Sequence, residues 1–407
     1  MAIDIDLVRM ETPGCAHVLH FNNAGASLMP EPVLSSIKGY LELEARIGAY
    51  EVEERARNMV ERLYLSTSHL LGCHPSEIAF LENATRAWDM AFYSIPFLPK
   101  DRILCSESEY SSNYIAFLHM AKKVGVSVEV IPNDEYGQIS LKSLETAIDD
   151  RVKLIALTHI PTNSSLINPA CEVGKIAQKA GILYLLDATQ SIGQIPLDVS
   201  SISCDILCAA GKKYLRGPRG TGLLYIRNEI LPSLSPPFLE LNSVKWISQN
   251  EFEIHPNARR FESWESSLAN KMGLGSAIDY ALKLGIKNIF QRITFLATLL
   301  RKNLSAIPDV TLHEQGKNKC GIVTFTIKDM HSNTVRQLLL KKHINVSIST
   351  EETARLNMPS RKLKDLVRAS IHYYNNEKEI ERFCNIISGL RKKRFQKLPS
   401  YSIASLT

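Results

Sequence analysis

Short runs of apolar residues alternate with longer amphipathic stretches between about residues 75 and 230. The short runs predict strands, and the amphipathic stretches predict helices because their apolar residues recur at helical spacing. The expected strands cover residues 102–105, 127–131, 154–157, 183–186, 206–209 and 222–226, and the expected helices cover 113–124, 141–148 and 170–180. Strands and helices that alternate in this way predict an α/β fold, with a mostly parallel sheet covered by helices.

The pattern changes after about residue 260. A long helical stretch covers residues 271–306 and is broken near Gly285. Further strands are expected at 322–327, 344–347 and 367–371, and further helices at 334–341 and 378–390. This order predicts a smaller α+β domain in the C-terminal part, with a boundary between residues 253 and 271.

The length and composition of the chain agree with two domains. A single compact core stops growing efficiently at ~250–300 residues, and this chain has 407. Its 45% hydrophobic and 22% charged residues are typical of a globular protein. We divide the chain into an N-terminal arm, a large domain, a small C-terminal domain and a tail, at residues 1–20, 21–260, 261–395 and 396–407.

Charge and cysteine content narrow the possible partners. The net charge is +6, and part of it lies in a basic run at residues 391–394, which we interpret as a solvated helix end, so no nucleic acid is expected. No window approaches ~18 uninterrupted apolar residues, and the first residues lack a secretory signal, so no membrane partner is expected. The eight cysteines are scattered without a Cys-x-x-Cys pair, which predicts a reduced, cytoplasmic protein without a metal site.

An acidic residue follows the apolar strand predicted at residues 183–186. Asp187 is succeeded by the small residues of the segment 188–193, which includes Gln190. Ligands of α/β proteins bind beyond the carboxyl ends of parallel strands, so Asp187 is placed to contact a bound group. Taken alone, the same residue could equally cap the next helix.

A glycine-rich turn with four cations follows the strand predicted at residues 206–209. The cations of this turn are Lys212, Lys213, Arg216 and Arg219. Taken alone, the turn predicts an anion-binding loop or a solvated hairpin, because neither the phosphate-loop motif nor the dinucleotide-binding motif fits it.

Together, the two motifs resemble the class V aminotransferase family of pyridoxal-phosphate enzymes, which includes cysteine desulfurases and isopenicillin N epimerase-like proteins. In that family an Asp-x-x-Gln precedes the cofactor-binding lysine by about the interval found here, where Lys213 follows Asp187 by 26 residues (213 − 187). The resemblance extends from Asn22 to Leu390. It implies fold type I, with a seven-stranded sheet in a large domain that binds pyridoxal 5′-phosphate, and a homodimer.

The resemblance also assigns roles around the cofactor. Lys213 would form the Schiff base, Asp187 would keep the pyridine nitrogen protonated, and Gln190 would hydrogen-bond the ring oxygen. Tyr110 would stack on the ring, although a core tyrosine is the alternative. The remaining expected contacts are Ala84 and Thr85 at the phosphate, Lys212 near it, and either Thr162 or Asn163 at the ring oxygen.

Other residues are assigned to an amino-acid substrate. Arg368 matches the arginine with which the family binds the substrate carboxylate, since a guanidinium contacts a carboxylate through two parallel hydrogen bonds. Asn22 and Asn23 match the segment that lines the substrate mouth, although a plain turn is the alternative.

The chain departs from the family pattern at three places. Cysteine desulfurases carry a persulfide-forming cysteine on a loop before the substrate arginine, and residues 349–366 contain none. Lys212 and Ala210 stand where the family often has histidine and serine, so one phosphate hydroxyl is missing. Ser266 is the remaining candidate for a phosphate contact across the dimer, because the Gly-Thr of the desulfurases is absent.

These features predict a lyase that breaks a carbon–sulfur or similar Cβ–X bond without a persulfide cysteine. Residues 213–220 and 260–265 look most like the epimerase and sulfoxide-lyase branch. An aminotransferase or an epimerase of the same family would share every residue named so far. A non-enzymatic binding protein is disfavoured, because Lys213, Asp187 and Arg368 are all present.

Overall fold

The larger sheet of the computed structural model, which describes residues 3–392, has seven strands. In sheet order they are β2 (Ile78–Leu81), β8 (Gly222–Ile226), β7 (Ile206–Ala210), β6 (Leu183–Asp187), β5 (Val152–Thr158), β3 (Arg102–Ser106) and β4 (Ser127–Ile131). The five strands from β7 to β4 run parallel, and β8 runs antiparallel to both of its neighbours. The predicted α/β fold with a mostly parallel sheet is therefore confirmed.

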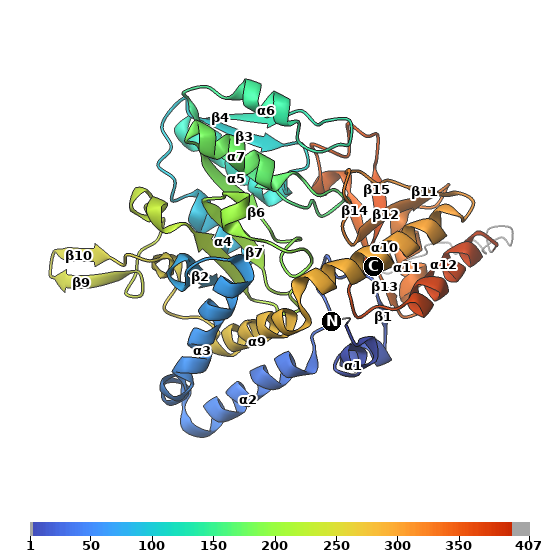
Figure 1. The fold of residues 1–407 in the computed structure, drawn as a ribbon, viewed down its shortest axis with the longest axis horizontal. Helices are drawn as coiled ribbons and strands as arrows, with labels where there is room; N and C mark the ends of the chain where they lie inside the picture. Colours follow the sequence, from blue (N-terminus) through green and yellow to red (C-terminus); the bar gives the residue numbers. More distant parts are fainter. Residues whose placement is uncertain (1–2, 393–407) are drawn as a thin grey trace, which may run out of the picture.

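Helices cover both faces of this sheet, as Figure 1 shows. Side chains alternate along β6, so Leu185 joins a core with Trp88 and Phe117, whereas Tyr184 and Leu186 join the core on the opposite face. The first face is covered by α4 (Ala84–Phe92) and α5 (Ser111–Val124), and the second by α6 (Leu141–Ala147), α7 (Ala170–Ala180) and α8 (Val199–Ile202). Burial on both faces explains why these strands have continuous apolar runs.

A smaller antiparallel sheet forms in the C-terminal part, drawn in orange and red in Figure 1. Its strands in order are β11 (Val310–Leu312), β12 (Ile322–Ile327), β15 (Asp365–Ser370) and β14 (Ser347–Thr350). The accompanying helices are α10 (Ile286–Ser305), α11 (Ser332–Leu340) and α12 (Glu377–Lys392). Their apolar faces share one core with the sheet, in which Phe325 of β12 contacts Phe383 of α12.

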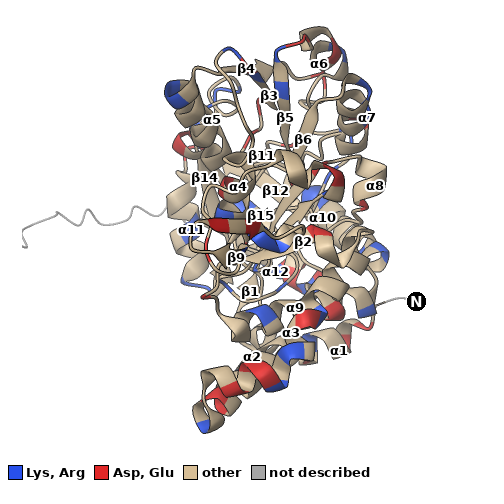
Figure 2. Ribbon diagram, turned by 90° about the vertical axis from the view of Figure 1, so that its left-hand side faces the viewer, with Lys and Arg blue, Asp and Glu red and all other residues tan. Residues whose placement is uncertain are grey.

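The long helical stretch predicted at residues 271–306 is broken at Gly285, as expected. Helix α9 (Leu268–Leu284) ends there, and the positive φ of +82° at Gly285 turns the chain into α10. Helix α9 packs on α2 (Glu31–Ile47) and α3 (Ala49–Leu71), whereas α10 packs on α12 and β12. Figure 2 shows α2 and α3 projecting at the lower end of the molecule. The boundary at residue 260 stays a prediction, and these contacts place the change of packing partners at Gly285.

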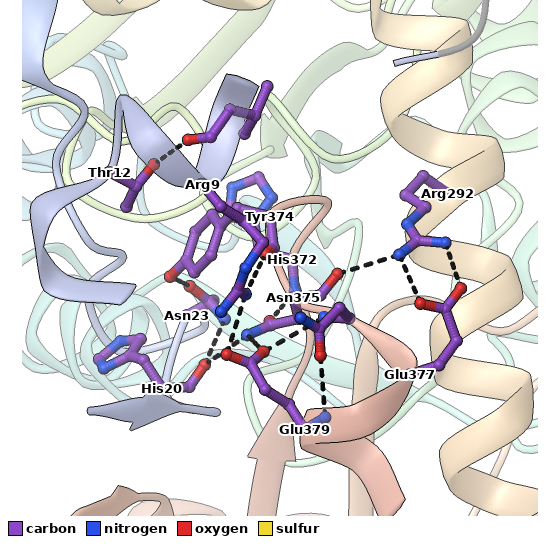
Figure 3. Close-up of polar contacts among 12 residues, drawn as sticks. Arg9, Thr12, His20, Asn23, Arg292, His372, Tyr374, Asn375, Glu377 and Glu379 are labelled. Atoms are coloured by element: carbon purple, nitrogen blue, oxygen red, sulfur yellow. Dashed lines mark hydrogen bonds and ion pairs between the residues drawn. The ribbon is translucent and has the colours of Figure 1, made fainter. Parts of the chain in front are cut away.

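The N-terminal segment packs against the C-terminal part of the chain. Strand β1 (Leu19–His20) pairs in parallel with β13 (Ile344–Asn345). Arg9 of α1 (Ile5–Met10) donates to the carbonyl oxygen of Tyr374 at 2.8 Å and to the carboxylate of Glu379 at 2.9 Å (Figure 3). The segment predicted as an arm at residues 1–20 is thus fixed by backbone pairing and by an ion pair.

The remaining elements are short. Strands β9 (Val244–Ser248) and β10 (Glu251–Ile254) form a hairpin that extends from the large domain in Figure 1. Short 3₁₀ helices lie at Pro13–Ala16, Pro75–Glu77, Asn228–Ser233, Ala258–Phe261 and Glu351–Thr353. Within residues 3–392, no helix combines the length and the apolar character needed to cross a membrane. The side chains of the basic run at 391–394 and the tail at 396–407 lie outside what the structure describes.

Candidate active site

A cavity of about 690 Å³ lies at the carboxyl ends of β5, β6 and β7. Most of the residues predicted to hold the cofactor line it, namely Ala84, Thr85, Tyr110, Thr162, Asp187, Gln190, Lys212 and Lys213. They come from separate strand ends and helix starts between residues 84 and 213. The fold therefore brings the two sequence motifs and the predicted phosphate turn into one site.

Lys213 lies in the cavity wall directly after β7 and carries an amine of lowered basicity. Burial of its ammonium group, together with the charges of Arg368 and Lys212, lowers the pKa to about 7, although Asp187 opposes the change. The pKa of Lys212 is also lowered, by burial and by the charge of Arg219. An amine with a pKa near 7 is largely neutral at physiological pH, as a nucleophile or a base must be.

Asp187 and Gln190 are fixed by hydrogen bonds at the end of β6. The carboxylate of Asp187 accepts from the backbone N–H of Thr189 at 2.9 Å and from the side chain of Asn113 at 3.0 Å. The amide of Gln190 donates to the carbonyl oxygen of Ala24 at 3.0 Å and to the hydroxyl of Thr162 at 3.3 Å. Its Oε1 atom is buried without a partner, which suits a side chain that faces a bound polar group.

The predicted phosphate turn lies at the N-terminus of α4. Asn83 caps this helix by accepting from the backbone N–H of Arg86 at 2.8 Å. The first N–H groups of a helix have no partner within it, so those of Ala84 and Thr85 are available to an anion. A Cβ atom on Gly222 would lie 2.4 Å from the carbonyl carbon of Asn83, so glycine is required where β8 passes the turn. Together with Lys212, this cradle fits a phosphate group.

Tyr110 stands at the start of α5 and is 38% exposed. It lines the cavity, so it is not a core tyrosine. This position agrees with a ring that stacks on a bound aromatic group.

Arg368, on β15 of the small sheet, contacts Thr162 of the cavity wall but does not itself line the cavity. Its guanidinium donates to the carbonyl oxygen of Thr162 at 3.0 Å, to the Thr162 hydroxyl at 2.5 Å, and to Asn22 at 3.3 Å. Burial lowers its pKa to about 10, and its Nε–H is buried without a partner. Arg368 therefore keeps one buried N–H donor without a partner behind the cavity wall.

Like Arg368 and Asn22, three other predicted residues do not line the cavity. Asn23 is fully buried, donates to the carbonyl oxygens of His20 and Ser370, and accepts from the Tyr374 hydroxyl at 2.5 Å, so its side chain joins the N-terminal segment to the small domain (Figure 3). Asn163 lines a small adjoining void with Tyr110, and its amide nitrogen has no partner. Ser266 lies in a separate surface cavity.

Two polar residues of the site were not predicted from the sequence. Glu109 and Asn113 are buried beside Asp187, and Asn113 donates to both carboxylates. Glu109 precedes the N-cap of α5 and Asn113 lies in its first turn, so the available signal was two polar residues close to the start of a predicted helix.

Comparisons with known proteins agree with this geometry. The aminotransferase class-V family model matches residues 19–383, so the chain belongs to this family. A probable cysteine desulfurase of Methanothermobacter thermautotrophicus is 29% identical, covering 92% of this chain and 95% of the relative. A probable cysteine desulfurase of Pyrococcus abyssi is 28% identical, covering 95% and 97%.

Solved structures share the whole fold. The apo cysteine desulfurase of Thermococcus onnurineus NA1 superimposes with a TM-score of 0.90 at 27% identity, covering 96% of this chain and 99% of that one. The cystine C–S lyase C-DES, in complex with cysteine persulfide, has a TM-score of 0.84 at 21% identity, covering 93% and 99%, which shows a common fold alone. The fold is therefore that of fold type I enzymes, and the protein is a pyridoxal-phosphate-dependent enzyme of the class V family.

Proposed function

We propose that the enzyme is a lyase that cleaves a carbon–sulfur bond, or a similar Cβ–X bond, of an amino-acid substrate without storing sulfur on a cysteine. The placement of its cysteines is the main support. All eight lie within the described residues, and none lines the cavity. Burial raises the pKa of each of their thiols. A sulfur-accepting cysteine must be a thiolate within reach of the substrate, and these are protonated thiols elsewhere.

The segment that precedes the substrate arginine supports the same proposal. Thr353, Ala354 and Asn357 of this segment line the small void beside Tyr110 and Thr162. The segment in which desulfurases carry a cysteine therefore places an asparagine at this adjoining void, and an asparagine is not a sulfur acceptor.

The residues of the site suit an elimination reaction. Bound pyridoxal phosphate supplies an electron sink that stabilises negative charge at the substrate α-carbon. Arg368 holds the substrate carboxylate, and the neutral amine of Lys213 accepts the α-proton. The sulfur group then leaves the β-carbon with the electron pair of the broken bond. Water then hydrolyses the remaining unsaturated amine to pyruvate and ammonia.

The same proposal includes a homodimer in which Ser266 acts at the partner's site. Ser266 lies at the surface beside Trp264, which is 62% exposed, in a cavity that also includes Tyr50. These side chains are accessible to a second copy of the chain. Light scattering should give twice the mass of one chain, and a fully active monomer would contradict this part of the proposal.

The test of the function is product analysis with a panel of cysteine, cystine, S-substituted cysteines and their sulfoxides. A lyase forms pyruvate and ammonia without an added keto acid, an aminotransferase requires one, and an epimerase changes only the chirality of the substrate. Each of the eight cysteines is then replaced in turn by alanine. Loss of turnover in one variant, with a persulfide on that cysteine in the wild type by mass spectrometry, would contradict the proposal.

A further inference from the structure

Asp187 is held in place by one hydrogen bond on each carboxylate oxygen. Oδ1 accepts from the backbone N–H of Thr189 at 2.9 Å, and Oδ2 accepts from Asn113 Nδ2 at 3.0 Å. The donor of the first bond is a backbone N–H group that lies just after β6. The second comes from α5, so Asn113 is the side chain that orients this carboxylate from another element.

The amide of Asn113 contacts a second carboxylate as well. Its Nδ2 atom donates to Oε1 of Glu109 at 2.8 Å. An uncharged amide has two N–H donors, and here both are directed at carboxylates. Asn113, at 3% exposure, therefore bridges two buried acidic groups without adding a charge of its own.

Glu109 is enclosed by donors and has no cation among its hydrogen-bond partners in the described chain. It accepts from the backbone N–H groups of Tyr110 at 3.0 Å and Thr158 at 3.1 Å, and from the Thr158 hydroxyl. Burial, with a contribution from the charge of Asp187, raises its pKa to about 7, and these hydrogen bonds limit the rise. The other titratable groups that face the pair are Cys105 on β3, Tyr184 on β6, Cys208 on β7 and Lys213.

We propose that Asn113 is a positioning residue that orients Asp187 toward the cofactor ring nitrogen. We also propose that Asn113 links Asp187 to Glu109, a second buried carboxylate whose charge acts on the same nitrogen. This inference rests on the proposed role of Asp187. When Glu109 is ionised, its charge adds to that of Asp187 near the ring nitrogen, so the nitrogen then holds its proton more strongly than a single carboxylate would allow. A ring nitrogen that stays protonated is the more effective electron sink.

The test follows the protonation of the ring nitrogen directly. Cofactor labelled with ¹⁵N at the ring nitrogen is bound without substrate, and the pH at which its NMR shift changes is measured. In Glu109→Gln, which keeps the shape and loses the charge, we expect this midpoint to fall by about one unit. In Asn113→Leu we expect a similar fall and a cofactor dissociation constant about ten- to a hundredfold higher, from the loss of hydrogen bonds to charged groups.

Asn133→Ala is the matched control. Asn133 donates to Glu107 at 2.8 Å and does not line the cavity. In this variant, the pH midpoint of ring-nitrogen protonation and the cofactor affinity should both stay at the wild-type values. A wild-type midpoint in Glu109→Gln would overturn the coupling even if Asn113→Leu fails to fold. A wild-type midpoint in Asp187→Asn would overturn the role of Asp187 and this proposal with it. Neither measurement involves turnover, so failure of the lyase assignment is a separate result.

Discussion

Arg368 and Thr162 are joined by two hydrogen bonds across the two sheets of the molecule. The guanidinium, on β15, donates at 3.0 Å to the carbonyl oxygen and at 2.5 Å to the hydroxyl of Thr162, which follows β5 and lines the cavity. The arginine is thus oriented before a substrate arrives. This preorganisation reduces the entropic cost of binding a carboxylate.

Arg368→Lys should therefore weaken substrate use and leave the cofactor in place. A lysine cannot keep two bonds to Thr162 and also present a planar fork to the substrate. We expect kcat/KM to fall about ten- to a hundredfold, mainly through KM, with an unchanged visible spectrum. The control is Arg355→Lys, an exposed arginine on the segment before β15. Wild-type kcat/KM in Arg368→Lys would contradict the assignment.

Lys213→Ala should abolish the visible absorbance of the purified protein, because that band arises from the covalent link between the lysine and the cofactor. Lys212→Ala should keep the band and lower the affinity for the phosphate group, since Lys212 contributes only a charge to the cradle. Absorbance spectra and equilibrium dialysis of both variants measure this. The reverse result would place the attachment at Lys212.

The rate of cofactor attachment should have a midpoint near pH 7. Burial lowers the pKa of Lys213 to about 7, and only its neutral amine attacks the cofactor aldehyde. The rate should be constant above pH ~8 and fall about tenfold per unit below pH ~6, whereas an ordinary lysine with pKa ~10.4 would give a rate that rises to about pH 10. Stopped-flow mixing of cofactor-free protein with pyridoxal phosphate measures it. A rate still climbing between pH ~8 and ~10 would count against the lowered pKa.

Gly222→Ala should lower cofactor affinity by displacing the phosphate turn. The added Cβ would lie 2.4 Å from the carbonyl carbon of Asn83 and 2.9 Å from the amide nitrogen of Ala84. Overpacking of this kind costs ~1–3 kcal/mol, so we expect a loss of affinity of about tenfold. Gly39→Ala is the control, because a Cβ there meets nothing within 4 Å on exposed α2. It should leave affinity unchanged and raise helix stability by ~1 kcal/mol.

Strands of the large sheet were predictable from local pattern. The runs at 127–131 and 222–226 form β4 and β8 with the predicted bounds, because apolar runs between turns leave few other structures open. Helices α2 and α3 were not predicted. Residues 49–71 carry many charges, and their buried positions are completed by α9, which lies about 200 residues later. Only the tertiary contact with α9 selects their apolar face.

The site was predictable where two motifs lie close in sequence, as Asp187 and Lys213 do. The contrast between Asn22 and Asn23 was not, because adjacent side chains point in different directions. One contacts Arg368, and the other is buried against Ser370. Such a difference depends on contacts with residues about 350 positions away in the chain, and the local sequence does not predict these contacts.

The pairing of β1 with β13 has a consequence for synthesis on the ribosome. His20 and Asn345, joined by a hydrogen bond, are 325 residues apart in the chain. At ~5–20 residues per second, translation of that interval takes roughly 20–60 s. The last strand of the large sheet ends at Ile226, so that sheet can assemble while the N-terminal segment still lacks its partner. The segment also supplies Ala24, which binds Gln190 in the cavity wall. The strand pair that fixes the N-terminal segment to the small domain can therefore form only after residue 345 has been synthesised, whereas all the residues that line the cavity are synthesised by residue 221.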